Sequence, residues 1–346
     1  MSTAAEDLLP WLREPLAAAL GATRGHHLLL VHGPEGVGQF EFALALAQGW
    51  LCEAPAGEPR PCGRCASCHL VQAHSHPDLL VLLPEALQEA LGWAPAAGEE
   101  GAAPKSERKP SKEIKVEAAR QAVAFAQLSC ARGRAKVVVL HPAERLNAVA
   151  ANTLLKTLEE PPGAARFILA SGDREALPAT VRSRCQALHL PLPPAAEAEQ
   201  WLAGQGVDDA AVMLAAAGGQ PLAAKAWADD GIDAAAWTRL PAQVARGDAG
   251  GLQGWPVPRA LDALLKLCHD ALLAGLRVAP RYFPAVPVPP RAAPLHAWQR
   301  RLAEVARHAE HPLNAGLLVE SLVLQGARAL AGEADARTRS LHSAHD

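Results

Sequence analysis

The sequence predicts an α/β domain built on a parallel sheet, followed by an all-α region. Five short apolar runs are separated by segments with helical periodicity, and a glycine-rich loop directly follows the first run. Continuous apolar runs of this kind are typical of parallel strands that helices cover on both faces. After residues 191–194 the strand-like runs stop and the helical periodicity continues, so we expect the sheet to end there.

The length and composition limit the classes of protein to which the chain can belong. A chain of 346 residues is long enough for two or three domains, and 50% hydrophobic residues allow real cores. The net charge of −3 weighs against a free-standing nucleic-acid binder, which would usually be basic. Glu6 and Asp7 stand where a signal peptide would be basic, and no stretch approaches the roughly 18 apolar residues of a membrane span. We therefore expect a cytoplasmic protein with reduced thiols.

The first apolar run, residues 27–32, enters the glycine loop, and helical spacing follows over residues 39–51. This order of strand, glycine loop and helix is the context that a phosphate-binding loop requires. The remaining strands are expected at residues 79–83, 137–140, 167–170 and 187–190.

The glycine loop has the frame of a phosphate-binding loop without its reactive side chains. In a working loop, G-x-x-x-x-G-K-[ST], backbone amides cradle the phosphates, the lysine neutralises them and the hydroxyl holds Mg²⁺. Here Gly33, Gly36 and Gly38 keep the frame, but Gln39 replaces the lysine and Phe40 replaces the hydroxyl. The first has no charge and the second cannot bind a metal. The loop therefore predicts an NTPase fold with no functional nucleotide site and no ATP turnover.

Three further regions are expected along the chain. Residues 84–112 contain a stretch rich in Pro, Gly, Ala, Glu and Lys without periodicity, which predicts a flexible insertion in a core domain of residues 1–191. Three short helices are expected at about 195–202, 208–217 and 222–228. They would form a small domain of residues 192–231, and longer helices would form a third domain of residues 232–346.

Four of the seven cysteines fall within a short segment with the spacing C-x9-C-x2-C-x2-C. Thiolates at such spacing can surround one Zn²⁺ tetrahedrally, and four sulfur ligands leave no open position, so the zinc is expected to be structural. A redox cluster is the alternative, and His69, His74 or His76 could replace one sulfur. The predicted ligands of this zinc knuckle, residues 52–68, are Cys52, Cys62, Cys65 and Cys68.

A turn before the last expected strand carries Ser183, Arg184 and Cys185. An arginine that one subunit presents to a γ-phosphate on its neighbour can act as an arginine finger, because its fixed charge and fork of donors stabilise charge that develops in phosphoryl transfer. Taken alone, an Arg-x-Arg turn is more often a solvated surface feature. The interpretation of Arg184 therefore depends on its context.

Several segments together resemble the clamp-loader branch of the AAA+ proteins over roughly residues 10–230. They are the cysteine cluster, His76-Pro77-Asp78 before an expected strand, the Ser-Arg-Cys turn, and residues 151–162, which read Ala-Asn-Thr-Leu-Leu-Lys-Thr-Leu-Glu-Glu-Pro-Pro. The last two are highly specific to clamp loaders. The resemblance implies an AAA+ parallel-sheet (RecA-like) core domain with a zinc knuckle, a three-helix lid domain and a C-terminal helical collar domain.

Three departures from the active ATPases of this family indicate a subunit that does not hydrolyse ATP. The loop lacks its lysine and hydroxyl. His141 follows the strand at 137–140 where an acid is expected, and only Glu144 is nearby. Leu222 stands about where active subunits have a further arginine. The alternative is an ATP-hydrolysing subunit of the gamma/tau type, which would need other residues to supply the missing chemistry of the loop.

The resemblance also implies partners. The chain would join gamma/tau and delta subunits in a hetero-pentameric ring, where Arg184, with Ser183 and Cys185 of its motif, would complete the ATP site of an adjacent gamma/tau subunit in trans. The ring would load a sliding clamp onto primer-template DNA during DNA replication, within a DNA-directed DNA polymerase holoenzyme of the bacterial cytoplasm. Two other classes stay open: a zinc-dependent nucleic-acid module, and a purely structural scaffold in which Arg184 is only a surface residue.

Overall fold

A computed structural model describes residues 8–23, 25–55, 57–93, 110–289, 291–307 and 314–332 of the chain. The chain forms two compact units, residues 1–197 and 198–346. Each unit has its own buried hydrophobic cluster. The border lies just after the proline-rich segment 191–194, where the sequence changes from strand-like to helical.

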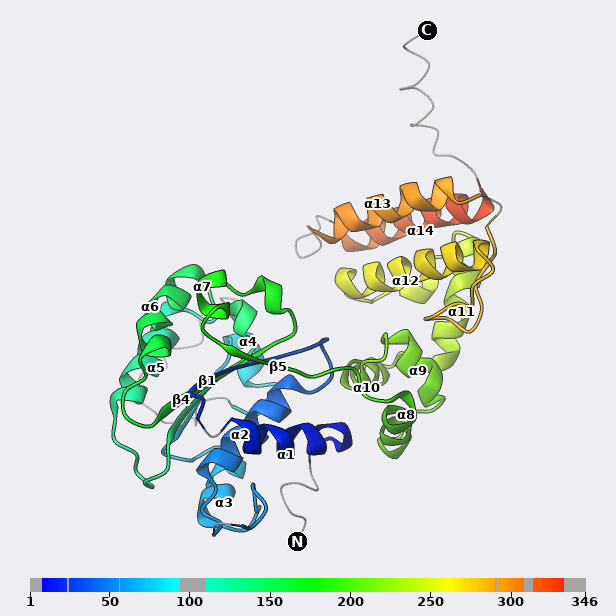
Figure 1. The fold of residues 1–346 in the computed structure, drawn as a ribbon. Helices are drawn as coiled ribbons and strands as arrows, with labels where there is room; N and C mark the ends of the chain where they lie inside the picture. Colours follow the sequence, from blue (N-terminus) through cyan, green and yellow to red (C-terminus); the bar gives the residue numbers. More distant parts are fainter. Residues whose placement is uncertain are drawn as a thin grey trace. The chain divides into compact units, whose positions relative to one another are not determined.

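The first unit is built on a five-stranded sheet in which all neighbouring strands pair in parallel. The strand order is β2-β3-β4-β1-β5, so β1 lies between β4 and β5 (Figure 1). The predicted parallel sheet is therefore confirmed, and each predicted strand overlaps an observed one. The strands are β1 (Leu28–His32), β2 (Leu79–Leu82), β3 (Lys136–Leu140), β4 (Ala165–Ser171) and β5 (Gln186–His189).

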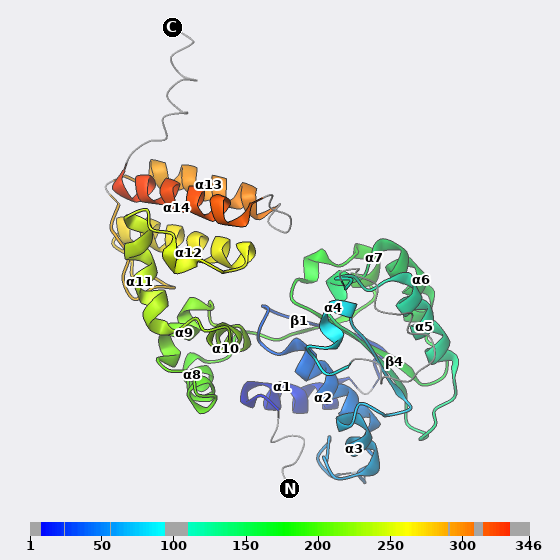
Figure 2. The ribbon, with the colours of Figure 1, turned by 180° about the vertical axis from the view of Figure 1, so that it is seen from behind.

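Helices cover both faces of this sheet, which is why its strands are apolar throughout. Successive side chains of a strand point to opposite faces, and Leu30, Val138 and Phe167 pack in one cluster with residues of α5 and α6. Helices α1 and α2 lie on the other side of the sheet, as Figure 1 and the view from behind in Figure 2 show. The helices of this unit are α1 (Arg13–Ala22), α2 (Gln39–Leu51), α3 (Ala66–Gln72), α4 (Glu85–Gln88), α5 (Val116–Gln127), α6 (Ala148–Glu159) and α7 (Ala179–Arg182), with 3-10 helices η1 (Pro10–Leu12), η2 (Ala143–Arg145) and η3 (Arg174–Ala176).

The regular elements in the described residues of the second unit are all helices, and its hydrophobic cluster runs from Ala198 to Leu330. Trp237 is fully buried in this cluster, where its Nε1 donates to the carbonyl oxygen of Tyr282 (2.9 Å) and its ring stacks on Phe283. Because residues from both ends of the unit share one cluster, its helices pack as one body.

The three short helices predicted between residues 195 and 228 are confirmed as α8, α9 and α10. The division of the helical region at residue 231 into lid and collar stays a prediction. None of the helices in the described part of the chain is long and apolar enough to span a bilayer. The helices are α8 (Ala195–Gly204), α9 (Ala210–Ala216), α10 (Pro221–Asp229), α11 (Ala234–Ala245), α12 (Val257–Gly275), α13 (Ala293–Ala306) and α14 (Ala315–Ala331), with the 3-10 helix η4 (Gly250–Leu252).

Part of the segment predicted as a flexible insertion has regular structure. Helix α4 lies within it, and the Glu85 carboxylate pairs with Lys115 (2.8 Å between Oε1 and Nζ) and accepts from the backbone N–H of Ser111 (2.9 Å). These contacts join the two ends of the segment. Residues 94–109, on which most of the prediction falls, lie outside the described residues.

A buried ion pair fixes the start of β2 against β3. Asp78 is 0% exposed and pairs with the nearly buried Lys136 (2.8 Å between Oδ1 and Nζ). Its carboxylate also accepts from the backbone N–H groups of Ala131 and Arg132, at 2.8 Å each. Burial opposes ionisation of Asp78, but these hydrogen bonds and the Lys136 charge outweigh it and lower the pKa of the carboxyl group.

The substitution Asp78→Asn is expected to destabilise the protein by about 3–5 kcal/mol, because it leaves the buried Lys136 charge without its counterion. Urea unfolding at neutral pH measures this loss. Since the pKa of Asp78 is lowered in the folded state, its contribution is complete above the unfolded-state pKa of about 3.9 and is lost as the pH falls through the folded-state pKa. The double variant Asp78→Asn/Lys136→Met should recover part of the loss, and a change below about 1 kcal/mol in the single variant would contradict the role given to the pair.

Candidate functional site

The glycine loop joins β1 to α2 as the sequence predicts. Gly36 (φ 73°) and Gly38 (φ 99°) both have positive φ values, which favour glycine. A Cβ atom on Gly33 would lie 2.1 Å from the carbonyl oxygen of Leu190, so this position also requires glycine. The glycine frame is therefore a geometric requirement of the turn itself.

The side chain of Gln39 is turned back onto the loop. Its Nε2 donates to the carbonyl oxygens of Gly33 (2.7 Å) and Pro34 (2.5 Å), and only 5% of the residue is exposed. A lysine at this position would carry a positive charge toward bound phosphates. Gln39 instead uses both of its amide hydrogens inside the loop, so the loop offers no cation to a nucleotide.

Phe40 and His141, which follows β3, pack against each other where an active loop would have side chains that bind a metal. The buried Phe40 ring stacks on the imidazole of His141, with ring centroids 5.0 Å apart. Burial lowers the pKa of His141, against the smaller opposing effect of Glu144, so the imidazole is neutral near pH 7. Neither Phe40 nor a neutral imidazole supplies the oxygen ligands that Mg²⁺ prefers.

Two carboxylates border this end of the sheet. Glu144 Oε1 accepts from the backbone N–H of Gly172, which follows β4 (3.1 Å), while Glu144 Oε2 and His141 Nδ1 are buried without a hydrogen-bond partner in the structure. The Glu35 side chain lies against the same glycine, since a Cβ atom there would be 2.5 Å from Glu35 Cγ. These two carboxylates add negative charge beside the loop, so a polyphosphate there would need a cation such as Mg²⁺ to compensate it.

The four predicted cysteine ligands come together. Their sulfur atoms all lie within 4.8 Å of one another, and the Cys62–Cys68 and Cys52–Cys65 pairs are each separated by 4.0 Å. Zinc–sulfur bonds of about 2.3 Å in a tetrahedron place the sulfurs about 3.8 Å apart. The group could therefore hold a metal ion, and its spacing is compatible with zinc.

Backbone N–H groups surround the sulfur atoms. Cys52 Sγ accepts from the N–H groups of Ala54 and Cys62, and Cys65 Sγ accepts from those of Glu53 and Cys68, all at 3.4 Å. These donors offset part of the negative charge that four thiolates would bring to the site. The three histidines considered as substitutes are not in the group.

The cysteine segment is attached to the sheet by a chain of hydrogen bonds that the cysteine spacing does not predict. The backbone N–H of Asp78 donates to His76 Nδ1 (3.0 Å), His76 Nε2 donates to Ser67 Oγ (2.7 Å), and Ser67 Oγ donates to the carbonyl oxygen of Leu51 (2.8 Å). This chain of bonds requires the neutral imidazole, and burial lowers the pKa of His76 in agreement. The His-Pro-Asp segment thus connects β2 to the residues beside Cys52 and Cys68.

The Ser-Arg-Cys turn directly follows α7. Cys185 points inward, where its Sγ lies 3.3 Å from the carbonyl oxygen of Val181 and burial raises its pKa to about 12. Arg184 points outward with its side chain about one third exposed. The turn therefore presents an arginine at the surface from a backbone that is anchored in the core.

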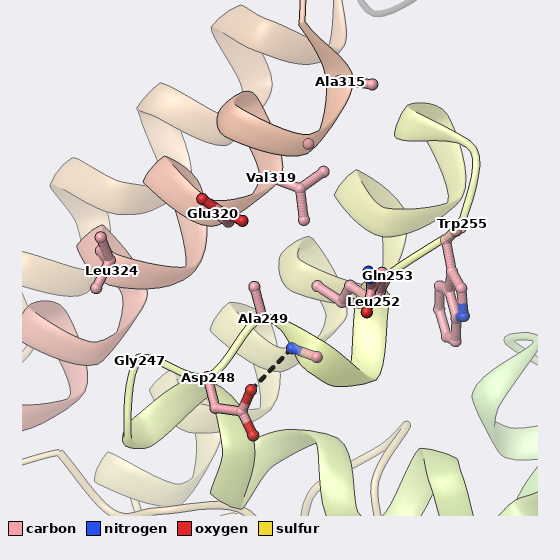
Figure 3. A pocket seen from close by; sticks show the side chains of 13 residues that line it. Gly247, Asp248, Ala249, Leu252, Gln253, Trp255, Ala315, Val319, Glu320 and Leu324 are labelled. Atoms are coloured by element: carbon pink, nitrogen blue, oxygen red, sulfur yellow. Dashed lines mark hydrogen bonds between the residues drawn. The ribbon is translucent and has the colours of Figure 1, made fainter.

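A hollow of about 680 Å³ lies in the second unit, between residues 247–255 and the first turns of α14. Figure 3 shows Val319 and Glu320 of α14 on one side of it and Leu252 on the other, with Asp248 bonded to the backbone N–H of Gly250 (2.8 Å). Its walls mix small and apolar residues with two carboxylates, and no residue of the glycine loop or the cysteine group contributes to it.

The sequence of the first unit matches one known family. A family model described as DNA polymerase III, delta subunit, matches residues 10–194, which is more than half of the chain. The chain therefore belongs to this family of DNA polymerase III subunits.

Individual relatives narrow the resemblance to delta-prime subunits. The chain is 36% identical to DNA polymerase III subunit delta′ of Pseudomonas aeruginosa over 231 residues, which are 65% of this chain and 63% of that protein. It is 38% identical to subunit delta′ of Escherichia coli over 60% of this chain and 56% of that protein. The matches thus span less than two thirds of these relatives. They confirm the delta-prime resemblance that the altered loop indicates.

Two further similarities concern other members of such complexes. The tau subunit of Escherichia coli is 35% identical over 51% of this chain and 23% of its own length. A solved structure of a gamma subunit-related protein from Thermotoga maritima shares 15% identity, covers 91% of this chain and 99% of its own, and has a TM-score of 0.48.

The double variant Gln39→Lys/Phe40→Thr, tested as the isolated chain, is expected to hydrolyse ATP no faster than background. It restores the two loop side chains but leaves His141 where a metal-binding acid would be needed. Phosphate release at millimolar ATP and Mg²⁺ measures the rate. Turnover at rates typical of enzymes, above about 1 s⁻¹, would show that the loop side chains alone suppress hydrolysis.

The substitution Cys65→Ser is expected to lower the metal content of the purified protein from about one ion per chain to a small fraction and to lower its melting temperature, because a metal held by four thiolates contributes to folding stability. Elemental analysis and thermal unfolding measure the two effects. Cys130→Ser is the matched control, since Cys130 is half-buried and lies outside the group. Full metal content and an unchanged melting temperature in Cys65→Ser would rule out the cluster.

Proposed function

We propose that this protein is a delta-prime-type subunit of a DNA polymerase III clamp loader that does not hydrolyse ATP, and that it supplies Arg184 as an arginine finger to the ATP site of an adjacent gamma/tau subunit. The observation that carries the proposal is that the side-chain amide of Gln39 donates both of its hydrogen bonds to carbonyl groups of the loop itself. A chain with a nucleotide-binding fold and no cation at its loop is best suited to act on a nucleotide held elsewhere.

The position of Arg184 supports a role in trans. The arginine is exposed, and the buried Val181 before it and the half-buried Cys185 after it hold the turn against the core. A guanidinium presented from such a turn can reach a phosphate on another subunit without rearrangement of the backbone. Stabilising the charge of phosphoryl transfer in this way can raise the rate by about 10³–10⁵-fold.

The cysteine group is proposed to hold one structural Zn²⁺ through Cys52, Cys62, Cys65 and Cys68. The spacing of the sulfur atoms and the four backbone donors support this assignment. Four protein ligands leave no open position, so the metal would join the end of α2 to the start of α3 and take no part in a reaction.

The names of the relatives support the partners that we propose. In the proposed assembly, the chain joins gamma/tau and delta subunits in a five-membered ring, with the collar part of the second unit in the ring contacts. The ring loads a sliding clamp onto primer-template DNA in the bacterial cytoplasm. A gamma/tau-like ATPase is the second candidate, favoured by the 35% identity to tau subunits, and it is disfavoured by Gln39, Phe40 and His141.

The substitution Arg184→Ala, in a complex reconstituted with gamma/tau and delta subunits, is expected to lower the DNA- and clamp-stimulated ATPase rate by at least about tenfold, because one site loses its charge donor. The isolated chain should be inert in the same assay. Arg182→Ala is the matched control: it removes an arginine of the same turn whose guanidinium pairs with Glu175 of this chain. An unchanged rate with Arg184→Ala in an assembled complex would refute the finger, and ATP hydrolysis by the isolated chain would place the protein with the motor subunits.

A further inference from the structure

The guanidinium of Arg184 already has partners within its own chain. Its Nε and Nη2 atoms both contact Glu159 Oε1. Its Nη1 donates to the carbonyl oxygen of Thr180 (2.6 Å) and lies 3.4 Å from Ser183 Oγ. All three nitrogen atoms are therefore engaged, and a phosphate that binds this arginine has to replace some of these contacts.

Glu159 stands at an unusual place for an acid. It is the last residue of α6, where the helix dipole presents partial negative charge and a carboxylate is disfavoured. Its pairing with Arg184 offsets this cost. Acids placed against a local preference often mark functional positions, and here the position brings a carboxylate to the one arginine that the Ser-Arg-Cys turn presents.

The pair is suited to exchange because it lies at the surface. The side chains of Arg184 and Glu159 are 36% and 43% exposed, so water and salt weaken their attraction. The backbone on both sides is fixed, since Val181 is fully buried and Cys185 points into the core. The movement that frees the guanidinium is therefore a rotation of side chains and leaves α6 and α7 in place.

We propose that Glu159 is a positioning residue that holds Arg184 in a parked position, and that the γ-phosphate of a nucleoside triphosphate on the adjacent subunit displaces it. This inference rests on the proposed function. Glu159 competes with the phosphate for the Nε–Nη2 edge of the guanidinium, which is the edge that binds an anion in a bidentate manner. A phosphate with two negative charges attracts the guanidinium more strongly than a single carboxylate does, so it can displace Glu159.

Glu160, the residue after Glu159, supplies a matched control. Glu160 is an acid of the same length and is exposed, and it forms no ion pair with Arg184 in the structure. Glu159→Gln and Glu160→Gln therefore remove the same charge from adjacent positions, and only the first removes the competitor.

The test measures ATPase rate against ATP concentration in the reconstituted complex with wild-type protein, Glu159→Gln, Glu160→Gln and Arg184→Ala. Glu159→Gln is expected to lower KM for ATP by about two- to fivefold, the range that an exposed ion pair can supply, with kcat within about twofold. At saturating ATP the arginine has left Glu159 in either protein, so kcat is unaffected. The difference in KM should shrink as salt is added, because salt screens the competing charge, and Glu160→Gln should match the wild type.

The outcomes separate a failure of the proposed function from a failure of the parked position. If Arg184→Ala leaves the rate unchanged, the proposed function fails. If Arg184→Ala lowers the rate but Glu159→Gln has an unchanged or higher KM, the parked position is refuted and the proposed function stands. The same holds if Glu159→Gln lowers kcat as much as Arg184→Ala does. Thermal unfolding of every variant shows that folded proteins are compared, and Glu159→Ala is a second variant expected to shift KM in the same direction.

Discussion

Burial of β1 between β4 and β5 is the constraint on which the first unit depends. Leu29, Leu30 and Val31 are fully buried, so the strand cannot shift by one residue without moving its side chains to the opposite faces. Parallel strands end at the same edge of a sheet, and this brings the loop after β1 beside His141 after β3 and Gly172 after β4. The acidic, packed surroundings of the loop thus follow from strand order, although their residues are far apart in the sequence.

Features with a local cause could be predicted from the sequence. The strands are continuous apolar runs, the loop glycines satisfy positive φ values, and the short spacings within 62–68 bring three of the four thiols together. Pairings that depend on how helices pack could not be predicted. Glu159 and Arg184 are 25 residues apart and meet only because α6 packs beside α7. The sequence shows that both are charged, and it does not show that one holds the other.

The loop illustrates how a polar side chain can replace a ligand. A working phosphate loop keeps donors available for the nucleotide, whereas here the donors of Gln39 are used by Gly33 and Pro34. The stacking of Phe40 on His141 similarly fills space next to the loop with apolar contact. Gln39 and Phe40 thus both contact other residues of this chain, and these contacts stabilise the conformation of the loop.

Helix α2 is held at both ends by contacts outside itself. At its start, Gly38 lies so close beneath Leu9 that a Cβ atom would come within 2.6 Å of the leucine side chain. At its end, Ser67 Oγ donates to the carbonyl oxygen of Leu51, and Gln48 Nε2 donates to that of Cys68 (3.1 Å). Helix ends normally fray, and their amide hydrogens exchange with solvent through local opening. With contacts at both ends, the amide hydrogens of α2 are expected to exchange more slowly than those of a helix whose ends are free.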